Sequence, residues 1–362
     1  MRKSFVLAGI VCLFSFLILS PPTRAIAAGE IEFKFANYFP PPSAHSKMCE
    51  EFIKELEEET KGKVKVRYFA GGSMLTAPAM IKGIESGIAD MGLSHIEYTP
   101  GRMPVMEACD LPLGIASGWT ANQLVNDFYN KFKPKDWDKV KVLWMHASTP
   151  SVLITKKPVR TMEDLKGMTI RAPGRLAEVI QALGGTPAPT PVVETYDAMV
   201  KGVLDGVLIS LETLKTFRFG EVGKYVTYCW NIGPIYTMYV VMNKNSYKKL
   251  TPDVKEIFDR LCGKHGEKFA LGWNDIDFAG EDFAKERGLE FIDLSPEEQA
   301  RWSKACQPVI ENYVKSMVSA GHQEAEVREW IKYLNERSDY WTKKQIQYHI
   351  KSATGPKEMR GK

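Results

Sequence analysis

Arg171 is the residue of this chain whose type and setting most strongly suggest a chemical role. It stands within a short predicted strand over residues 168–172, which Pro173 ends. A guanidinium stays charged at any working pH, and burying it is costly unless it is paired. At the carboxyl edge of a sheet, such a side chain could hold a carboxylate through two parallel hydrogen bonds. The alternative is a structural ion pair with an acid such as Glu194 or Glu212.

Aromatic residues near the ends of other predicted strands could form the walls of a binding site, since such sites are mostly apolar with a few placed polar groups. Packing in the core or hinge is the alternative for each. Glu212 would repel an anion unless it holds an ammonium or hydroxyl group of the ligand, or orients Arg171. The candidate walls are Tyr38, Phe39, Tyr236 and Trp230, which precedes a turn, and the candidate polar contacts are His95, Ser148, Ser210 and Glu212.

The chain carries no motif for nucleotide binding or catalysis. It has no Gly-x-x-x-x-Gly-Lys-Ser/Thr loop, no Gly-x-Gly-x-x-Gly turn and no His-Glu-x-x-His site. Residues 92–96 resemble a nucleophile elbow, but Ile96 replaces its second glycine. Cys262 and His265 have a metal-like spacing without a second pair. We therefore expect no enzyme activity, no metal site and no cofactor.

The first residues read as a cleaved export signal over residues 1–27. A basic start and an apolar run over 5–19 precede a small-x-small site at 25–27, and the run is too short for a comfortable membrane span. An uncleaved membrane anchor is the alternative. The pattern predicts a protein that is exported to the periplasm.

The charge that remains after the signal is nearly balanced. Three of the 48 basic residues precede Ala28 and none of the 44 acidic residues does, which leaves 45 basic against 44 acidic residues. We therefore expect no nucleic-acid partner. The mildly basic stretch over 343–362 is expected to be a solvated tail.

Predicted strands and helices alternate along the rest of the chain. This alternation implies an α/β fold with a mostly parallel sheet covered by helices, and ligands at the carboxyl ends of the strands. Thr251-Pro252 begins an unusually long helix, and Ser295–Glu298 reads as a capping box. The predicted strands are 31–39, 64–69, 88–94, 140–144, 168–172, 235–243 and 289–294, and the predicted helices are 45–61, 77–86, 122–132 and 252–287.

Two segments of the chain resemble each other, as two similar α/β lobes would. Residues 80–93 and 198–209 each place a helix that ends in Gly-apolar-x-Asp before a strand. Coincidence between two helix-to-strand turns is the alternative. Crossings near 149–155 and 233–242 would join the lobes and form a hinged cleft. The expected division is 28–150 plus about 240–285 for lobe I, and 151–239 plus about 286–340, with the C-terminal helices, for lobe II.

Taken in order, several short motifs resemble the DctP-type extracytoplasmic solute-binding proteins of tripartite ATP-independent periplasmic (TRAP) transporters. The resemblance covers nearly the whole chain after the signal. It implies two α/β lobes joined by a hinge, with a long helix spanning both, and a protein that captures a carboxylate and delivers it unchanged to membrane permease subunits. By this resemblance Arg171 would form the carboxylate clamp. The motifs are Asp164–Gly167 with Ile170-Arg171, Leu183–Pro187, Glu194-x-Tyr196-x-Ala198, Gly202–Gly206, and Met242-Asn243 before Leu250–Val254.

Two departures from the family pattern bear on the ligand. The sialic acid and dicarboxylate branches tend to carry an asparagine in Asp-Gly-x-x-Asn, where this chain has Ile209. The sialic acid branch also has a second arginine on the strand before the clamp, where this chain reads Ala147–Val152. The absence of these two polar side chains favours a ligand that is a monocarboxylate with an apolar, branched or aromatic remainder.

Two alternative functions remain open. The protein could be a binding component of an ABC-type transporter or sensor system, or a secreted α/β enzyme that acts on a carboxylate.

Overall fold

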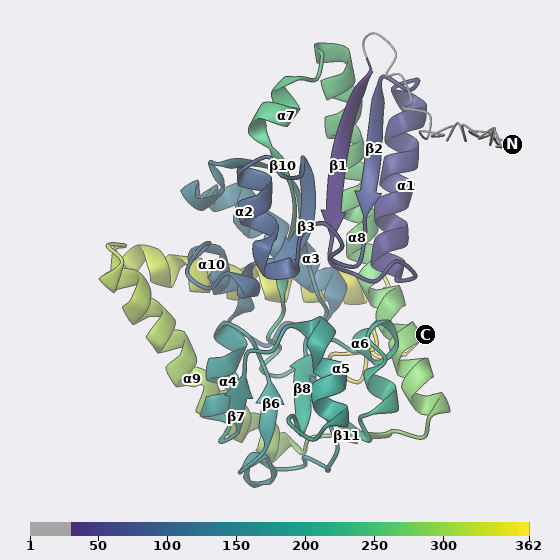
Figure 1. The fold of residues 1–362 in the computed structure, drawn as a ribbon. Coiled ribbons are helices and arrows are strands. Elements are labelled where there is room, and N and C mark those ends of the chain that lie inside the picture. Colours follow the sequence, from purple (N-terminus) through teal and green to yellow (C-terminus); the bar gives the residue numbers. More distant parts are fainter. Residues whose placement is uncertain (1–29, 362) are drawn as a thin grey trace, which may run out of the picture.

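The computed structural model describes residues 30–361, which fold into two α/β lobes stacked one above the other (Figure 1). Each lobe is built on its own mixed sheet, one of five strands and one of six. The predicted fold class is therefore confirmed. The predicted signal over residues 1–27 lies outside the described residues. Within the described residues, no helix has the length and apolar character needed to cross a membrane.

The first lobe is formed by a sheet with the strand order β2-β1-β3-β10-β4. The first helix begins one residue before the predicted start, because the Ser43 hydroxyl caps it by accepting a hydrogen bond from the Ser46 N–H. The strands are β1 (Ile31–Asn37), β2 (Val64–Phe69), β3 (Met91–His95), β4 (Val140–Ala147) and β10 (Thr237–Asn243), and the helices are α1 (Ala44–Glu59), α2 (Met80–Glu85), α3 (Gly118–Phe132) and α7 (Lys244–Lys248).

The second lobe is formed by a sheet with the strand order β11-β9-β5-β8-β6-β7. Its inner strands β5 and β8 are short and fully buried, which suits a sheet covered on both faces. The strands are β5 (Val152–Thr155), β6 (Thr169–Arg171), β7 (Thr186–Ala188), β8 (Gly206–Ile209), β9 (Tyr225–Tyr228) and β11 (Glu290–Asp293), and the helices are α4 (Arg175–Ala182), α5 (Val192–Val200) and α6 (Thr213–Thr216).

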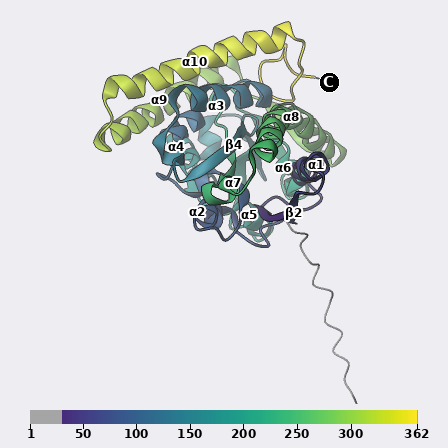
Figure 2. The same ribbon diagram turned by 90° about the horizontal axis from the view of Figure 1, so that it is seen from above.

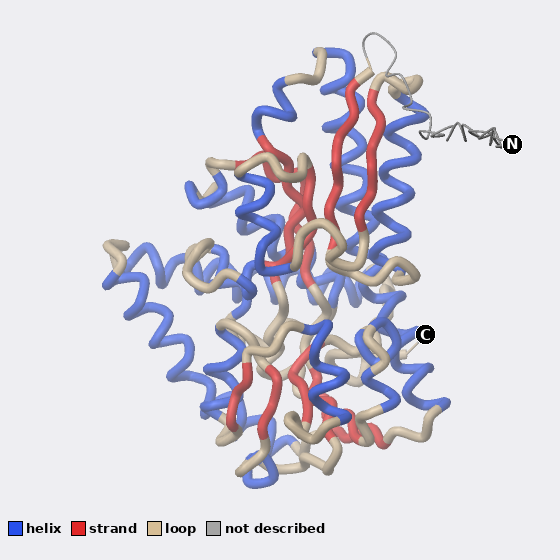
Figure 3. Tube along the Cα trace, viewed as in Figure 1, coloured by secondary structure: helices blue, strands red, loops and turns tan. Residues whose placement is uncertain are grey.

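Each sheet contains one strand that runs against the others, so the sheets are mixed and not purely parallel. In the first sheet β10 is antiparallel to β3 and β4, and in the second β5 is antiparallel to β8 and β9. These are the strands on which the chain enters each lobe from the other. The remaining strands end at the side that faces the other lobe, so an entering strand must start there and run the opposite way (Figure 1). Figure 3 shows the loops, in tan, that join the two sheets, in red, at the level between the lobes.

The two crossing segments lie side by side and are hydrogen-bonded to each other. The Ser148 N–H donates to the Tyr236 carbonyl at 3.1 Å, and the Ser151 N–H donates to the Pro234 carbonyl at 2.9 Å. The Tyr236 N–H also donates to the Ser148 hydroxyl at 3.0 Å. A paired two-segment hinge of this kind permits bending between the lobes while it resists their separation.

The long helix α8 (Pro252–Glu286) is a third connection between the lobes. It packs against α1, α3 and β4 of the first lobe and against α6 of the second. Gly280 permits the second contact, because a Cβ there would lie 2.3 Å from the Leu211 carbonyl oxygen. The predicted start at Thr251-Pro252 and the predicted length are both confirmed.

The C-terminal helices α9 (Pro296–Ser319) and α10 (Glu324–Gln347) reach both lobes, and do not belong to the second lobe alone as expected. The α9 helix packs on α4, whereas α10 returns along α3 of the first lobe (Figure 2). At the start of α9 the Ser295 hydroxyl accepts from the Glu298 N–H, as in a capping box. The Glu298 carboxylate instead accepts from the Met162 N–H and the Trp302 indole.

The last residues also differ from the expected solvated tail. The α10 helix extends to Gln347, and the residues that follow it fold back onto the protein. Ser352 and Thr354 are buried, and a Cβ on Gly355 would lie 2.5 Å from the Ala116 carbonyl oxygen. Lysines over this stretch remain at the surface, because their flexible stems let the charged ends reach water while the backbone packs.

Candidate functional site

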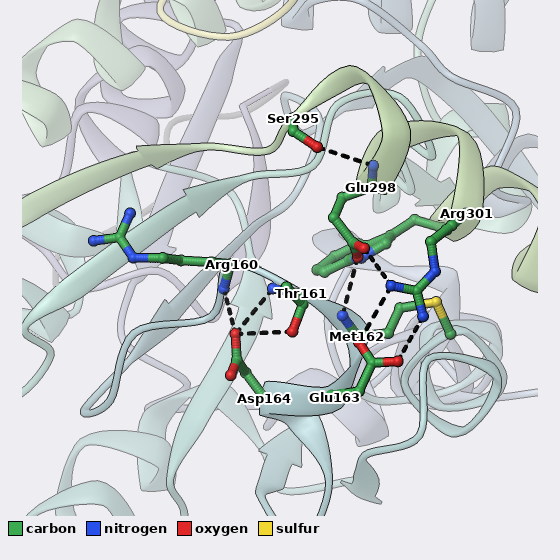
Figure 4. A network of polar contacts seen from close by, with 9 residues as sticks. Arg160, Thr161, Met162, Glu163, Asp164, Ser295, Glu298 and Arg301 are labelled. Carbon is green, nitrogen blue, oxygen red and sulfur yellow. Dashed lines mark hydrogen bonds and ion pairs between the residues drawn. The ribbon is translucent and has the colours of Figure 1, made fainter.

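The segment before β6 is held by a cap that sets the path of the chain toward Arg171 (Figure 4). The Asp164 carboxylate accepts hydrogen bonds from the Arg160 N–H at 2.8 Å and the Thr161 N–H at 2.9 Å. Gly167 then turns the chain at a φ of 79°, a conformation that favours glycine. The Asp164–Gly167 motif therefore has a local structural role next to the strand that carries Arg171.

A second carboxylate holds the start of β6 in the sheet. Asp205 accepts from the Thr169 N–H through its side chain and donates its own N–H to the Thr169 carbonyl, each at 2.8 Å. Asp90 makes the same pair of bonds with Lys34 in the first lobe, at 2.8 and 2.9 Å. The internal sequence similarity therefore corresponds to one shared device, which in the second lobe lies two residues before Arg171.

Arg171 is completely buried at the carboxyl end of β6 and is surrounded by uncharged acceptors. Its Nε donates to the Thr190 carbonyl at 2.8 Å, and one terminal nitrogen donates to the Tyr236 hydroxyl at 2.9 Å. The other lies 3.5 Å from the Tyr98 hydroxyl. No ion pair within residues 30–361 includes Arg171, so the predicted alternative of a structural salt bridge is not observed. The guanidinium is a buried positive charge without a counterion.

A cavity of about 20 Å³ lies beside Arg171 at the junction of the two lobes. Its walls come from β3, β10 and the residues just after β1 in the first lobe, and from β6, β8, α5 and α6 in the second. A volume of this size holds about one water molecule, so an organic acid requires the lobes or the side chains to move apart. The lining residues are Tyr38, Phe39, His95, Tyr98, Arg171, Val192, Ile209, Ser210, Glu212, Thr213, Phe217, Tyr236 and Met238.

Seven of the nine predicted site residues line this cavity, and Trp230 and Ser148 do not. Trp230 is half-buried in a loop that is fastened to α9, where the Asn231 amide donates to the Gln299 carbonyl at 2.9 Å. The Ser148 hydroxyl is used within the hinge, because it donates to the Thr149 carbonyl and accepts from the Tyr236 N–H. Ser148 therefore serves the crossing between the lobes, whereas Trp230 lies in a loop outside the cavity.

Aromatic rings form one continuous wall around the cavity. Tyr38 stacks on Phe39 with ring centroids 4.4 Å apart and meets Tyr98 edge-on at 5.9 Å. The centroid of the His95 ring lies 3.8 Å from that of Tyr98 and 5.2 Å from that of Tyr236. Tyr98 was not among the predicted site residues. Its position three residues after His95, just past the end of β3, could have indicated that it lies at the same edge of the sheet.

The titratable groups of the cavity are held in their uncharged forms, with Arg171 as the exception. Burial, and then the charge of Arg171, lowers the pKa of His95 well below its usual value. Burial raises the pKa of Glu212 to about 8, and the neighbouring Asp277 adds to the rise. At neutral pH the cavity therefore has an excess positive charge, which favours a monoanion.

A second group of charged residues joins the lobes beside the cavity. The Glu97 carboxylate of the first lobe accepts from the Arg175 N–H at the start of α4, at 2.7 Å. The Arg175 side chain in turn donates to Glu107 of the first lobe at 3.0 Å. Gly174 makes the approach possible, because a Cβ there would lie 1.3 Å from a Glu97 oxygen. No sequence motif indicated these contacts, since they form only when two distant segments meet.

The family model described as bacterial extracellular solute-binding protein, family 7 (DctP), matches residues 35–316 of this chain. A solute-binding protein of Albidiferax ferrireducens is 27% identical over 267 residues, which are 71% of this chain and 77% of that protein. The residues matched by the family model span both lobes, so the similarity includes the elements that form the cavity.

Two solved structures extend the similarity to the fold. A TRAP periplasmic solute-binding protein from Desulfovibrio salexigens is 32% identical, with a TM-score of 0.74 over 86% of this chain and 97% of that one. A marine metagenome TRAP solute-binding protein in complex with 3-hydroxybenzoate has a TM-score of 0.81 over 86% of this chain and 99% of that one, at 23% identity, which shows a shared fold. The chain therefore belongs to bacterial extracellular solute-binding protein family 7, the DctP family of TRAP transporter solute-binding proteins.

Proposed function

We propose that this protein captures a small organic monocarboxylate in the periplasm and delivers it to the membrane permease subunits of a TRAP transporter. The observation that carries the proposal is the buried guanidinium of Arg171, which faces an aromatic cavity between the lobes without a counterion. A carboxylate placed there would supply the missing charge and two well-directed acceptors.

The walls of the cavity support a monocarboxylate with an apolar or aromatic remainder. Tyr38, Phe39 and Phe217 present ring surfaces, and Arg171 is the one permanently charged cation among the described lining residues. A second carboxylate on the ligand would lack a partner there and would be costly to bury. The bound 3-hydroxybenzoate of the marine metagenome protein is an acid of this kind.

Opening and closing of the lobes would admit and retain the ligand. The cavity of about 20 Å³ is too small for such an acid, so the lobes must bend apart at the hinge for entry. Closure would exclude water from the carboxylate and Arg171 and thereby strengthen their attraction. The capture involves no bond making or breaking, and the export signal expected over residues 1–27 would bring the protein to the periplasm.

Substitution of Arg171 tests this proposal. We expect Arg171→Ala to weaken carboxylate binding by roughly 2–5 kcal/mol, as when one partner of a buried charge pair is removed. Arg171→Lys should recover only part of that loss, because an ammonium keeps the charge but not the planar two-point fit. The measurement is isothermal titration calorimetry with the acids that raise the melting temperature most in a thermal-shift screen.

Arg218→Ala is the matched control, because Arg218 lies in the same lobe with its side chain 66% exposed and paired with Glu221. It should leave the affinity unchanged. An Arg171→Ala protein that is folded and binds the same acid as tightly as the wild type would show that the clamp assignment is wrong.

A further inference from the structure

Glu212 is a buried acidic residue that lines the cavity. Its carboxyl group has few hydrogen-bond partners among the described residues. It is 2% exposed and lines the same cavity as Arg171, just before α6. One carboxyl oxygen lies 3.5 Å from the Ser210 hydroxyl, the limit for a hydrogen bond. The other has no partner with hydrogen-bond geometry among the described residues. Buried polar atoms are almost always paired, so this one needs an explanation.

The surroundings of Glu212 do not explain it as a structural residue. It forms no ion pair with Arg171 or with any other cation in residues 30–361, and the bond to Asp277 of α8 is made by its backbone N–H, at 2.9 Å. Any residue except proline could provide that N–H. The side chain of Thr216 at the end of α6 offsets part of the rise in the pKa of Glu212, but one carboxyl oxygen still has no hydrogen-bond partner among the described residues.

The position of Glu212 relative to Arg171 suggests a task in recognition. The pKa of the Tyr38 phenol is raised by burial and by Tyr98, raised further by Glu212 and lowered by Arg171. The Tyr38 ring thus lies within electrostatic reach of both groups. Tyr38, Arg171 and Glu212 line the same cavity, so a ligand whose carboxylate binds Arg171 and whose body packs on Tyr38 would have its remaining atoms within walls that include Glu212.

We propose that Glu212 is a specificity residue that selects monocarboxylates bearing a hydroxyl group away from the carboxylate, and this inference rests on the proposed function of Arg171. A hydroxyl can both donate to and accept from a carboxyl group, which satisfies the orphan oxygen. Since the pKa of Glu212 is about 8, the group is mostly protonated at neutral pH and does not repel the ligand anion. An ammonium group would instead require the ionised form.

Matched acids that differ by one hydroxyl group test the proposal. The pairs are benzoate with 3-hydroxybenzoate, phenylacetate with 3-hydroxyphenylacetate, and butyrate with 4-hydroxybutyrate, measured by calorimetry at pH 7. The wild type should bind the hydroxylated member of at least one pair about tenfold more tightly or better. Glu212→Leu should lose this preference, so that the two members of each pair bind with affinities within about threefold of each other.

Glu212→Gln is the conservative variant, because its neutral amide keeps hydrogen-bonding capacity and cannot ionise. It should retain most of the hydroxyl preference. It should also remove the fall in affinity expected in the wild type as the pH rises through about 8, where ionised Glu212 repels the ligand.

Other titratable groups also face Glu212. They are Asp277 of α8, which titrates near pH 7, and Tyr38, Tyr98, Tyr236 and His95, whose shifted pKa values keep them uncharged at that pH. Asp277→Asn is therefore a control that should preserve the fall but move it to a somewhat lower pH, because the Asp277 carboxylate adds to the rise in the pKa of Glu212.

The outcomes separate the two proposals. If the wild type binds acids but prefers no hydroxylated member, or if folded Glu212→Leu keeps the preference, the role of Glu212 is wrong while the carboxylate site stands. If the wild type binds no organic acid, or binds them independently of Arg171, the proposed function itself fails and the inference falls with it.

Discussion

At the scale of the residue, buried charge is the feature that sets this site apart. Arg171 is completely buried and is held by a carbonyl and two phenolic hydroxyls, each of which compensates part of the desolvation cost. None carries a formal charge. A protein that needed only stability could replace such a group with a hydrophobic side chain of similar volume. Its presence beside a cavity therefore favours a binding role.

Asp277 provides a residue-scale prediction about pH. Burial raises its pKa from 3.8 to about 7, so the folded state holds this proton more tightly than the unfolded state. The resulting stabilisation is fully present below about pH 4 and is lost as the pH rises to about 7. We expect Asp277→Asn to raise the free energy of unfolding by roughly 2–4 kcal/mol at pH 8 and to leave it nearly unchanged at pH 4, by urea denaturation.

Asparagine keeps an oxygen that can accept the Glu212 N–H, so the comparison isolates the charge. Exposed Asp275→Asn on the same helix is the matched control and should show no such pH-dependent difference. A gain of equal size at both pH values would contradict the explanation.

At the scale of the element, both lobes use one device to place their strands. An aspartate after a glycine-terminated helix binds a backbone N–H of a neighbouring strand, as Asp90 does for Lys34 and Asp205 for Thr169. In the second lobe this strand is β6, which is only three residues long. So short a strand needs additional anchors, and the Asp164 cap is the other.

Removal of this anchor should loosen the second lobe. We expect Asp205→Ala to lower the free energy of unfolding by about 1–2 kcal/mol, because the Thr169 N–H loses its acceptor. Asp205→Asn should lose less than half as much, since its side-chain oxygen can still accept. Hydrogen exchange at the Thr169 amide is the local measurement. Equal exchange rates in the wild type and Asp205→Ala would show that this bond does not hold β6.

At the scale of the whole molecule, four features bear on the proposed closure of the lobes. Three are chain connections, namely the two crossings and α8. The fourth is the set of contacts of Glu97 and Glu107 with Arg175, which we call the latch. The paired crossings and α8 hold the lobes together in every state, whereas the contacts of Glu97 and Glu107 with Arg175 join residues of opposite lobes next to the cavity. The contacts of the latch would have to break for the lobes to open. Their strength therefore sets how much of the ligand's binding energy is needed for closure.

Gly174 allows the latch to be tested without changing a charged residue. A side chain at this position would occupy the place of the Glu97 carboxylate, so Gly174→Ala should favour the open form. We expect a larger radius of gyration by small-angle X-ray scattering in the absence of ligand, and binding about tenfold weaker.

Gly167→Ala is the matched control for Gly174→Ala. Gly167 also has a positive φ, of 79°, and no neighbour within 4 Å of an added Cβ, so it introduces the backbone strain alone. It should lower stability without opening the protein. Equal scattering curves for the two variants would contradict the latch.

Local patterns in the sequence were enough to predict many elements of the fold. Thr251-Pro252 marked the start of α8, and the length of α8 followed from an uninterrupted helical pattern. Alternation of strands and helices indicated the α/β class. Signals of this kind survive in the sequence because caps and periodic apolar faces act within a few residues of themselves.

The sequence by itself determined that the chain is an α/β protein with a buried arginine at a strand end, since strand propensity and charge are properties of single segments. Only the tertiary structure shows that Arg171 has no counterion within residues 30–361, that Tyr98 completes the wall while Ser148 serves the hinge, and that Gly174 meets Glu97 across the lobes. These facts depend on contacts between residues far apart in the chain, and no local pattern encodes which distant segments will meet. Strand direction is a further case, because β5 and β10 run against their sheets only as a result of where the chain crosses between lobes.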